Sequence, residues 1–256
     1  MKAGEEIYRS PFVITVCSGK GGVGKSFIAA NIANLLADKG LAVLLWDADM
    51  HFPNQHLLVG AEPPVRLSDV YTGEMNVLQA IFKTTDNMHL LADTPATGKI
   101  REYSAEAILN VYKQLLIETE YDVIIIDTPA LTNDEVLQCC NIADLITIVV
   151  NDEPTSLLDA YGLLKILLPY IGKEFINLLV NNVIDVEDAD EISEKLNLAT
   201  EKFLNTQLDV IGFIPYDRAV RQSIVQQKLF TDFVKGSEVN KALNKIVENI
   251  LKQKNS

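Results

Sequence analysis

Continuous apolar runs alternate with stretches of helical periodicity along most of this chain. The runs that predict strands cover residues 12–17, 42–46, 88–92, 122–127, 146–150, 176–181 and 210–214. Apolar residues at helical spacing predict helices near 28–36, 104–118, 157–168 and 238–252, with shorter helices near 57–58 and 67–71. Runs that are apolar throughout are typical of strands buried on both faces. The pattern therefore predicts an α/β fold, a mostly parallel sheet with helices on both faces.

The 256 residues contain no repeat, no low-complexity segment and no linker rich in proline, glycine or serine. That length lies within the range of one large α/β layer structure. We therefore expect a single domain over residues 1–256, with residues 1–11 flexible.

Composition narrows the class of protein. The chain is 48% hydrophobic and carries a formal net charge of −13, which argues against nonspecific adhesion to DNA or anionic lipid. No apolar run is long enough to span a bilayer, and the first residues lack the apolar core of a signal peptide. Cys17, Cys139 and Cys140 are too few and too poorly spaced for a disulfide framework or zinc site. These features favour a cytoplasmic protein.

The most informative stretch is S-G-K-G-G-V-G-K-S at residues 18–26, between the first predicted strand and the first helix. Gly19, Gly24, Lys25 and Ser26 satisfy the phosphate-loop pattern G-x-x-x-x-G-K-[ST]. Glycines allow backbone N–H groups to surround a polyphosphate, and the helix start adds partial positive charge. Lys25 is then expected on the β- and γ-phosphates, and the Ser26 hydroxyl on Mg²⁺.

Carboxylates end two of the predicted strands. Asp127 follows an apolar strand after the phosphate loop, which is the Walker B pattern for an aspartate beside Mg²⁺. Asp47 and Asp49 end another strand, and the ligand ladder of a calcium loop is missing around them. His51 and His56 follow without a third metal ligand at recognisable spacing, so we expect both to be exposed to solvent.

Lys20, directly after the first glycine of the loop, is not required by the phosphate-loop pattern. The stretch K-G-G-V-G-K resembles the deviant Walker A motif of the MinD/ParA family of P-loop ATPases. The resemblance implies a three-layer P-loop NTPase fold, slow ATP hydrolysis with Mg²⁺, and a homodimer that forms around ATP. In that family the extra lysine reaches the phosphates held by the partner subunit, where a second cation stabilises the charge of the transferring phosphoryl group.

Other segments resemble the family's switches. Asp47 and Asp49, with Asn54, resemble switch I, in which Asp49 orients the attacking water and Asp47 supports the magnesium shell. Residues 127–130, D-T-P-A, resemble switch II, but Leu131 stands where a glycine is usual and puts the rate of hydrolysis in question.

The resemblance also assigns the adenine contacts to Asn181, which ends a strand, and to Pro215. The catalytic residues expected are Lys20, Lys25, Asp49 and Asp127. The metal residues expected are Ser26, Asp47 and Asp127. The nucleotide-binding residues expected are Gly19, Lys20, Gly21, Gly22, Val23, Gly24, Lys25, Ser26, Phe27, Asn181, Pro215 and Asp217.

Residues 153–161 and 214–221 narrow the resemblance to the MinD-like flagellar-number regulators known as FlhG, FleN or YlxH. Such proteins engage the flagellar GTPase FlhF, flagellar switch components and, in some lineages, a transcriptional activator. Asp159 falls where relatives keep an acidic residue near the dimer interface, and we expect it to pair with Lys20. The D-Q-A-x-x-L-R segment used to stimulate FlhF is not visible in residues 1–11.

Two questions stay open at this point. The apolar stripe of the last helix fits either a core-packing helix or peripheral contact with the inner face of the cell membrane, and the former is simpler. The alternatives to a flagellar switch are a ParA-type DNA- or cargo-partitioning ATPase and a metabolic relative, either a cobyrinic acid amide synthase-like ligase or an iron–sulfur scaffold. Adjacent Cys139 and Cys140 lack the C-x-x-C spacing of such scaffolds and are better explained as small buried helix residues.

Overall fold

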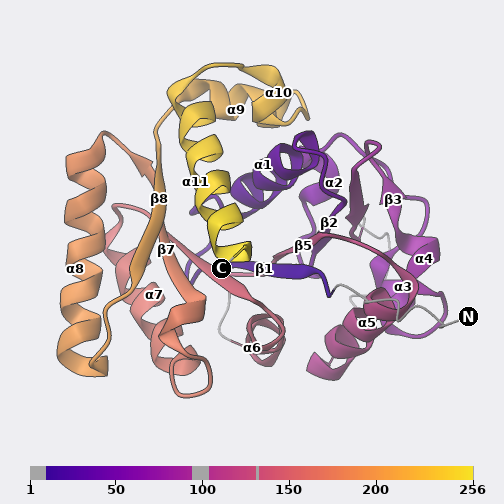
Figure 1. The fold of residues 1–256 in the computed structure, drawn as a ribbon, viewed down its shortest axis with the longest axis horizontal. Coiled ribbons are helices and arrows are strands. Elements are labelled where there is room, and N and C mark those ends of the chain that lie inside the picture. Colours follow the sequence, from indigo (N-terminus) through magenta and orange to yellow (C-terminus); the bar gives the residue numbers. More distant parts are fainter. Residues whose placement is uncertain (1–9, 94–103, 131–132, 256) are drawn as a thin grey trace, which may run out of the picture.

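The computed structural model describes residues 10–93, 104–130 and 133–255, and shows one eight-stranded sheet with the order β3-β4-β2-β5-β1-β6-β7-β8 (Figure 1). The strands are β1 (Phe12–Cys17), β2 (Val43–Asp47), β3 (Phe82–Lys83), β4 (Met88–Leu91), β5 (Val123–Asp127), β6 (Leu145–Val150), β7 (Ile176–Val183) and β8 (Asp209–Pro215). Neighbouring strands are parallel except for the pairing of β3 with β4. The predicted α/β class and the mostly parallel sheet are confirmed.

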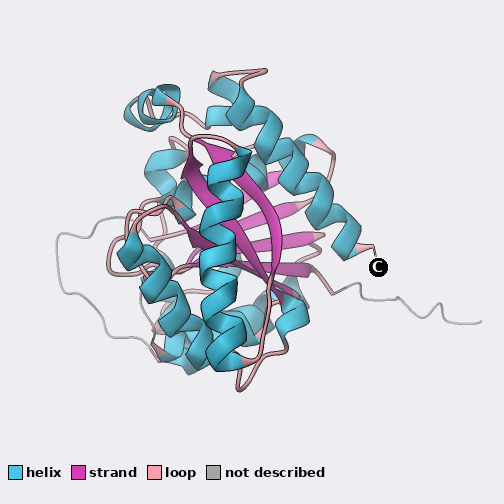
Figure 2. Cartoon of the chain, turned by 90° about the vertical axis from the view of Figure 1, so that its left-hand side faces the viewer, coloured by secondary structure: helices cyan, strands magenta, loops and turns pink. Residues whose placement is uncertain are grey.

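Helices cover both faces of the twisted sheet (Figure 2). They are α1 (Lys25–Asp38), α2 (Gln55–Leu58), α3 (Leu67–Tyr71), α4 (Val77–Ala80), α5 (Ala105–Glu118), α6 (Asp134–Asn141), α7 (Pro154–Leu167), α8 (Val186–Leu204), α9 (Arg218–Val225), α10 (Phe230–Phe233) and α11 (Glu238–Lys254), with a 3-10 turn, η1, at Lys173–Phe175. Apolar residues of α1, α10 and α11 pack on one face, and those of α3–α8 pack on the other. The expected three layers are present.

The continuous apolar runs are explained by this double covering. In β2, Val43 and Leu45 belong to the cluster under α1, whereas Leu44 and Trp46 belong to the cluster on the opposite face. All four are fully buried. Because successive side chains of a strand point to opposite faces, both sets must be apolar when both faces are covered.

Helix α11 settles one of the open questions about the last predicted helix. Its apolar stripe is buried against α1 and β8, the two elements with which α11 makes most of its contacts. The buried side chains are Val239, Leu243, Ile246, Val247 and Ile250. This stripe is therefore a core surface, as the simpler interpretation predicted.

The hydrophobic pattern of the sequence did not predict several of the elements. Strand β3 has two residues, and α4 and α10 have four each, which is too short for a periodicity to develop. Helix α9 has a polar outer face and contributes few deeply buried side chains. The expected flexible segment at the start of the chain lies, except for Ser10 and Pro11, outside the described residues.

The order of the sheet places the functional side chains. Strands β2, β5, β1, β6 and β7 are consecutive neighbours and run in the same direction, so their carboxyl ends share one edge. The candidate residues Asp47, Asp127 and Asn181 lie at or near such ends, and the glycine-rich loop follows β1 directly. Ligand sites of open α/β sheets form at this edge.

Candidate functional site

The loop at residues 18–24 connects the centre of the sheet to the start of α1. Gly22 and Gly24 have φ angles of 80° and 100°, a region that residues with a Cβ rarely adopt. Gly19 packs so closely on α7 that an added Cβ would be 2.2 Å from the Asp159 carbonyl oxygen. The free N–H groups at the start of α1 face the same loop, which makes this place suited to an anion.

Lys25 lies at the base of the loop and is buried. Its ammonium donates to the Ser18 hydroxyl at 3.0 Å, and that hydroxyl donates to the Lys20 carbonyl at 2.6 Å. Burial lowers the pKa of Lys25, an effect that the negative charge of nearby Asp127 opposes. The chain thus holds a desolvated cation beside the position expected for phosphate, where its charge is strongly felt.

Asp47 and Asp127 are direct neighbours in the pairing of β2 with β5, and both side chains are buried. Burial raises the pKa of Asp127 to about 6, against the effects of the Ser26 hydroxyl, the Lys25 charge and the Gln55 amide. Burial, together with the charge of Asp127, also raises the pKa of Asp47. Two adjacent buried carboxylates repel each other when both are ionised, and a divalent cation between or beside them would stabilise the ionised forms.

The two aspartates of the expected switch I accept hydrogen bonds from the loop that follows β2. The Asp47 carboxylate accepts hydrogen bonds from the backbone N–H groups of Asp49 (3.1 Å), Asn54 (2.9 Å) and Gln55 (2.9 Å). Asp49 accepts one from the backbone N–H of Phe52 at 3.0 Å and is only partly buried. Asp47 therefore binds the loop backbone in this structure, and its support of a metal stays a prediction.

Gln55, which the sequence analysis missed, lies at the centre of this arrangement. Its side chain is fully buried and donates to Asp127 Oδ2 at 2.8 Å and to the Ser26 carbonyl at 3.1 Å. A glutamine at the start of a short helix carries no pattern that marks it in a sequence. Only the packing of α2 against the loop and β5 brings this amide to the site.

Four buried polar atoms of the described chain have no hydrogen-bond partner, and all belong to residues of this region: Asn54 Oδ1, Gln55 Oε1, His56 Nδ1 and Asp127 Oδ1. Such atoms are rare in folded proteins and call for an explanation.

The expectation that His56 is exposed is wrong: it is 5% exposed because α2 turns it inward, and burial lowers its pKa. His51 is exposed, as expected.

Lys20 is held by its own chain. Its ammonium donates to the Thr155 hydroxyl at 2.8 Å and also pairs with Glu153, both at the start of α7. About a quarter of its side chain is exposed. Among the described residues Lys20 is paired with Glu153 and not, as expected, with Asp159, which lies against Gly19.

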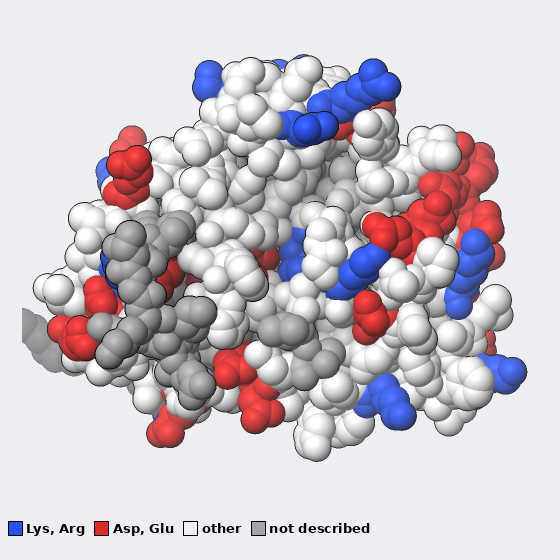
Figure 3. Space-filling model, turned by 180° about the vertical axis from the view of Figure 1, so that it is seen from behind, with Lys and Arg blue, Asp and Glu red and all other residues white. Residues whose placement is uncertain are grey.

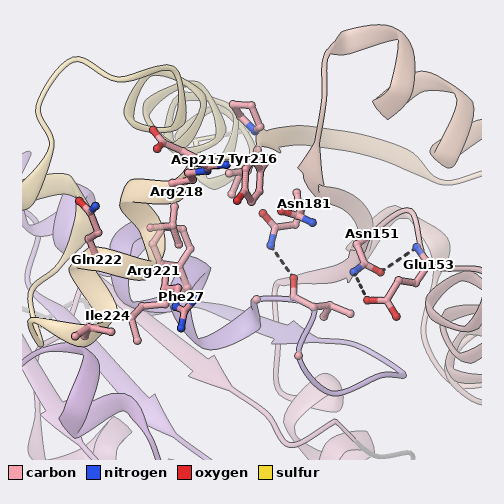
Figure 4. A pocket seen from close by; sticks show the side chains of 18 of the residues that line it. Phe27, Asn151, Glu153, Asn181, Tyr216, Asp217, Arg218, Arg221, Gln222 and Ile224 are labelled. Atoms are coloured by element: carbon pink, nitrogen blue, oxygen red, sulfur yellow. Dashed lines mark hydrogen bonds between the residues drawn. The ribbon is translucent and has the colours of Figure 1, made fainter.

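A cavity of about 960 Å³ extends from the loop across the ends of β7 and β8 to α9 (Figure 4). Asn181 lies at the centre of this cavity and donates through Nδ2 to the Val23 carbonyl at 2.7 Å. The Oδ1 atom of Asn181 takes no part in that hydrogen bond. Residues named from the sequence that line the cavity are Gly22, Val23, Gly24, Phe27, Asn181, Pro215 and Asp217. Tyr216 and Arg221 line it as well and were not predicted.

Some predicted residues have structural roles that the sequence did not specify. Asp217 accepts from the backbone N–H of Ala219 at 2.8 Å and caps the start of α9. Thr128 of the expected switch II donates its hydroxyl to the Val16 carbonyl at 3.2 Å. Leu131, the departure noted in switch II, lies outside the described residues.

The cysteines, the possible metal ligands and the helices bear on whether the chain has a disulfide, a metal cluster or a membrane span. Cys17, Cys139 and Cys140 are free and buried, as the sequence predicted for the last two. Across residues 10–93, 104–130 and 133–255, no three His, Cys, Asp or Glu side chains are grouped as metal ligands. Among the helices within those ranges, none is long and apolar enough to cross a membrane.

Fold and site together define a P-loop nucleotide-binding protein: a parallel sheet, a glycine-rich loop after its central strand, and a buried lysine and aspartates at one edge. The family model ParA, described as "NUBPL iron-transfer P-loop NTPase", matches residues 10–251. The chain belongs to this MinD/ParA family of P-loop NTPases.

Individual relatives agree with this assignment. The chain is 30% identical over 241 residues to the "Antiactivator FleN" of Pseudomonas aeruginosa, covering 93% of this chain and 85% of the relative. It is 25% identical to the "Flagellum site-determining protein YlxH" of Helicobacter pylori, covering 91% and 79%. The crystal structure of the cell division ATPase MinD of Pyrococcus furiosus superposes with a TM-score of 0.79 at 27% identity, covering 95% and 99%.

Proposed function

We propose that this chain is a Mg²⁺-dependent ATPase that acts as a dimerisation switch, with ATP held between two copies. The observation that carries the proposal is the position of Lys20. Its ammonium contacts Thr155 and Glu153 at the edge of the site, whereas Lys25 occupies the base of the loop. A cation at that edge can reach the phosphates of a second copy that docks over the loop, once it exchanges Thr155 and Glu153 for them.

The residues present fit a magnesium–nucleotide complex. The Ser26 hydroxyl lies close enough to Asp127 to lower its pKa, yet Asp127 Oδ1 has no hydrogen-bond partner. An orphaned carboxylate oxygen beside a hydroxyl matches the oxygen donors that Mg²⁺ takes in such sites. A MinD of Pyrococcus horikoshii, 23% identical with a TM-score of 0.78, was solved as a complex with Mg-ADP. We assign Ser26 and Asp127 to the metal, with Asp47 in support.

Within the nucleotide cavity, Asn181 suits an adenine base. Its Nδ2 is engaged by the Val23 carbonyl, so Oδ1 is free to accept from the exocyclic amino group of adenine. Guanine presents a carbonyl oxygen at that position, which Oδ1 would repel. Pro215 and Tyr216 line the same cavity and supply apolar surface for the ring.

For hydrolysis, the chain supplies charge and orientation. Lys25 and the Lys20 of a second copy would stabilise negative charge on the transferring phosphoryl group, and a Mg²⁺ held by Ser26 and Asp127 would add positive charge there. Asp49, partly buried in the loop after β2, is the residue that orients the attacking water. The backbone bonds that Asp47 accepts keep this loop in place.

The cellular role we propose is control of flagellar number or placement. It is supported by the similarity to FleN and YlxH over nine-tenths of the chain. An FlhF-type GTPase and flagellar switch proteins are the partners expected in the cytoplasm, at the inner face of the cell membrane.

The competing functions differ in charge and metal content. A DNA-partitioning role requires a basic surface, but the net charge is −13, and the face in Figure 3 has acidic and basic side chains interspersed. An iron–sulfur role, suggested by the iron-transfer wording of the family model, requires accessible ligands, whereas the three cysteines are buried. A salt-dependent DNA-binding assay and iron analysis of anaerobically purified protein test these two alternatives.

The dimerisation switch is tested by measuring the molecular mass in solution with ADP and with ATP. Wild-type protein is expected to form dimers with ATP and Mg²⁺, and Asp49→Ala is expected to form dimers that persist because hydrolysis is lost. Lys20→Ala is expected to lose dimerisation, hydrolysis or both. The control is Lys39→Ala, which removes an exposed lysine at the far end of α1. Full turnover by Lys20→Ala at saturating protein would contradict the proposal.

A further inference from the structure

Gln55 carries a buried side-chain amide beside Asp47 and Asp127. Its exposed fraction is 0%, and its backbone N–H and its side-chain amide bond different partners. The backbone N–H donates to Asp47 Oδ2 at 2.9 Å. The side chain donates to Asp127 Oδ2 at 2.8 Å and to the Ser26 carbonyl at 3.1 Å. One residue therefore connects the loop after β2, the phosphate loop and the Walker B aspartate.

The hydrogen bond from Gln55 engages one of the two carboxylate oxygens of Asp127. Nε2 of Gln55 donates to Oδ2, and the Oδ1 atom has no hydrogen-bond partner. The Oε1 atom of Gln55 is also buried without a partner. Leaving a buried acceptor unpaired costs about 1–3 kcal/mol, so two such atoms at one site indicate a ligand that satisfies them.

Packing alone does not account for this residue. An apolar side chain of the same length would fill the space without the desolvation cost of an amide. The start of α2 does not need the amide either, because the backbone N–H groups of Asn54 and Gln55 are already satisfied by Asp47. The amide is thus explained by the hydrogen bonds it donates to Asp127 and to the Ser26 carbonyl rather than by a need of the helix start.

We propose that Gln55 is a positioning residue of the metal–nucleotide site, which orients Asp127 so that Oδ1 faces the cation and presents its own Oε1 to a water of the metal shell. The proposal rests on the function proposed above, in which Mg²⁺ accompanies the nucleotide. It adds a link from switch I to the metal: a shift of the loop after β2 moves Gln55 and so changes the hold on Asp127. Outer-shell partners of this kind commonly change metal affinity by about 10–100-fold when they are mutated.

The test is the substitution Gln55→Met, which keeps the length of the side chain and removes both polar atoms. Binding of a fluorescent ADP analogue is measured with EDTA and over a series of Mg²⁺ concentrations. We expect nucleotide affinity in EDTA to stay within about twofold of wild type, while the Mg²⁺ concentration for half-maximal effect rises about 10–100-fold. Gln114→Met is the matched control, since Gln114 is a partly buried glutamine on α5 that accepts a backbone bond from Val77.

A double-mutant cycle separates positioning from packing. If Gln55 acts through Asp127, Gln55→Met changes the Mg²⁺ response of an Asp127→Ala protein by less than about twofold, whereas a packing role predicts additive effects. Additive effects, an unchanged Mg²⁺ response in Gln55→Met, or equal loss of affinity with and without Mg²⁺ would overturn the inference.

A measurement on the unaltered chain covers the case in which Gln55→Met does not fold. The NMR signals of the Gln55 side-chain amide are expected to shift when Mg²⁺ is added to the ADP complex, while those of Gln114 stay in place; unchanged Gln55 signals would contradict the inference. The proposed function fails separately, if wild-type protein binds ADP equally well with and without Mg²⁺.

Discussion

The ammonium group of Lys20 lies 2.8 Å from the hydroxyl oxygen of Thr155 in the same chain. The first residue after the opening glycine of the phosphate loop is thereby attached to the first turn of α7, more than a hundred positions later in the sequence. Glu153, which precedes that turn, pairs with the same ammonium and lowers its own pKa by doing so. For Lys20 to serve a second copy of the chain, these contacts have to be exchanged for contacts with phosphate.

The first prediction concerns this exchange. Glu153→Gln removes the charge that holds Lys20 and is expected to strengthen ATP-dependent dimerisation by roughly twofold or more, a modest effect because the pair is exposed. Sedimentation velocity with ATP and Mg²⁺ measures the dimer dissociation constant. Glu187→Gln, an equal change of charge on the exposed start of α8, is the control. Weaker dimerisation of Glu153→Gln alone would show that Glu153 supports the dimer instead.

The second prediction concerns the backbone of the loop. Gly24 has a φ angle of 100°, and an added Cβ would lie 2.3 Å from Nδ2 of Asn181. Left-handed backbone costs other residues about 1–2 kcal/mol, and the clash adds to this, so Gly24→Ala is expected to weaken ATP binding by about tenfold or more. Isothermal titration calorimetry measures the affinity. Gly162→Ala is the control, since Gly162 lies on α7 outside the loop and its added Cβ would meet nothing within 4 Å; equal losses in the two variants would contradict the explanation.

The third prediction concerns the last helix. Ile246 is 1% exposed and packs against Gly212 of β8, where an added Cβ would lie 2.6 Å from its Cγ1 atom. Ile246→Ala is expected to lower the free energy of unfolding by about 2–5 kcal/mol, as buried truncations do. Chemical denaturation measures it, and Lys245→Ala, on the exposed side of α11, is expected to change it little. A near-neutral Ile246→Ala that instead reduced binding to anionic vesicles would favour a membrane role for the stripe.

The fourth prediction concerns pH. Burial, with a smaller contribution from the charge of Lys83, lowers the pKa of His89, whose Nδ1 lies 2.7 Å from the Tyr121 hydroxyl. As the pH falls below 6.5, the ordinary pKa of histidine, His89 binds protons more readily in the unfolded chain than in the native one. The free energy of unfolding therefore falls as the pH falls. His89→Gln is expected to make the fall in unfolding free energy between pH 7 and pH 5.5 less steep. Urea denaturation across that range measures the slope; an unchanged slope would contradict the assignment.

The sequence reached the fold class and the phosphate loop because both are written in local patterns. Apolar runs such as 123–127 predict strands buried on both faces, and the glycine spacing in residues 19–26 predicts a loop with positive φ angles. The residues of β3, α4 and α10 could not be recognised, because elements of two to four residues contain no period. His56 was misjudged for the same reason, since one turn of helix does not reveal which side faces the core.

What the sequence determined by itself is the pattern of the phosphate loop, the aspartate that ends β5 and the α/β class, since each depends on residues that are neighbours along the chain. Only the tertiary structure decided which distant groups meet at the site. It brought Gln55 to Asp127, Thr155 to Lys20 and Asn181 to the Val23 carbonyl. The physical reason is that a hydrogen bond depends on distances of about 3 Å between atoms. Those distances are set by how β2, β5, β7 and α7 pack at one edge of the sheet, and no spacing in the sequence encodes them.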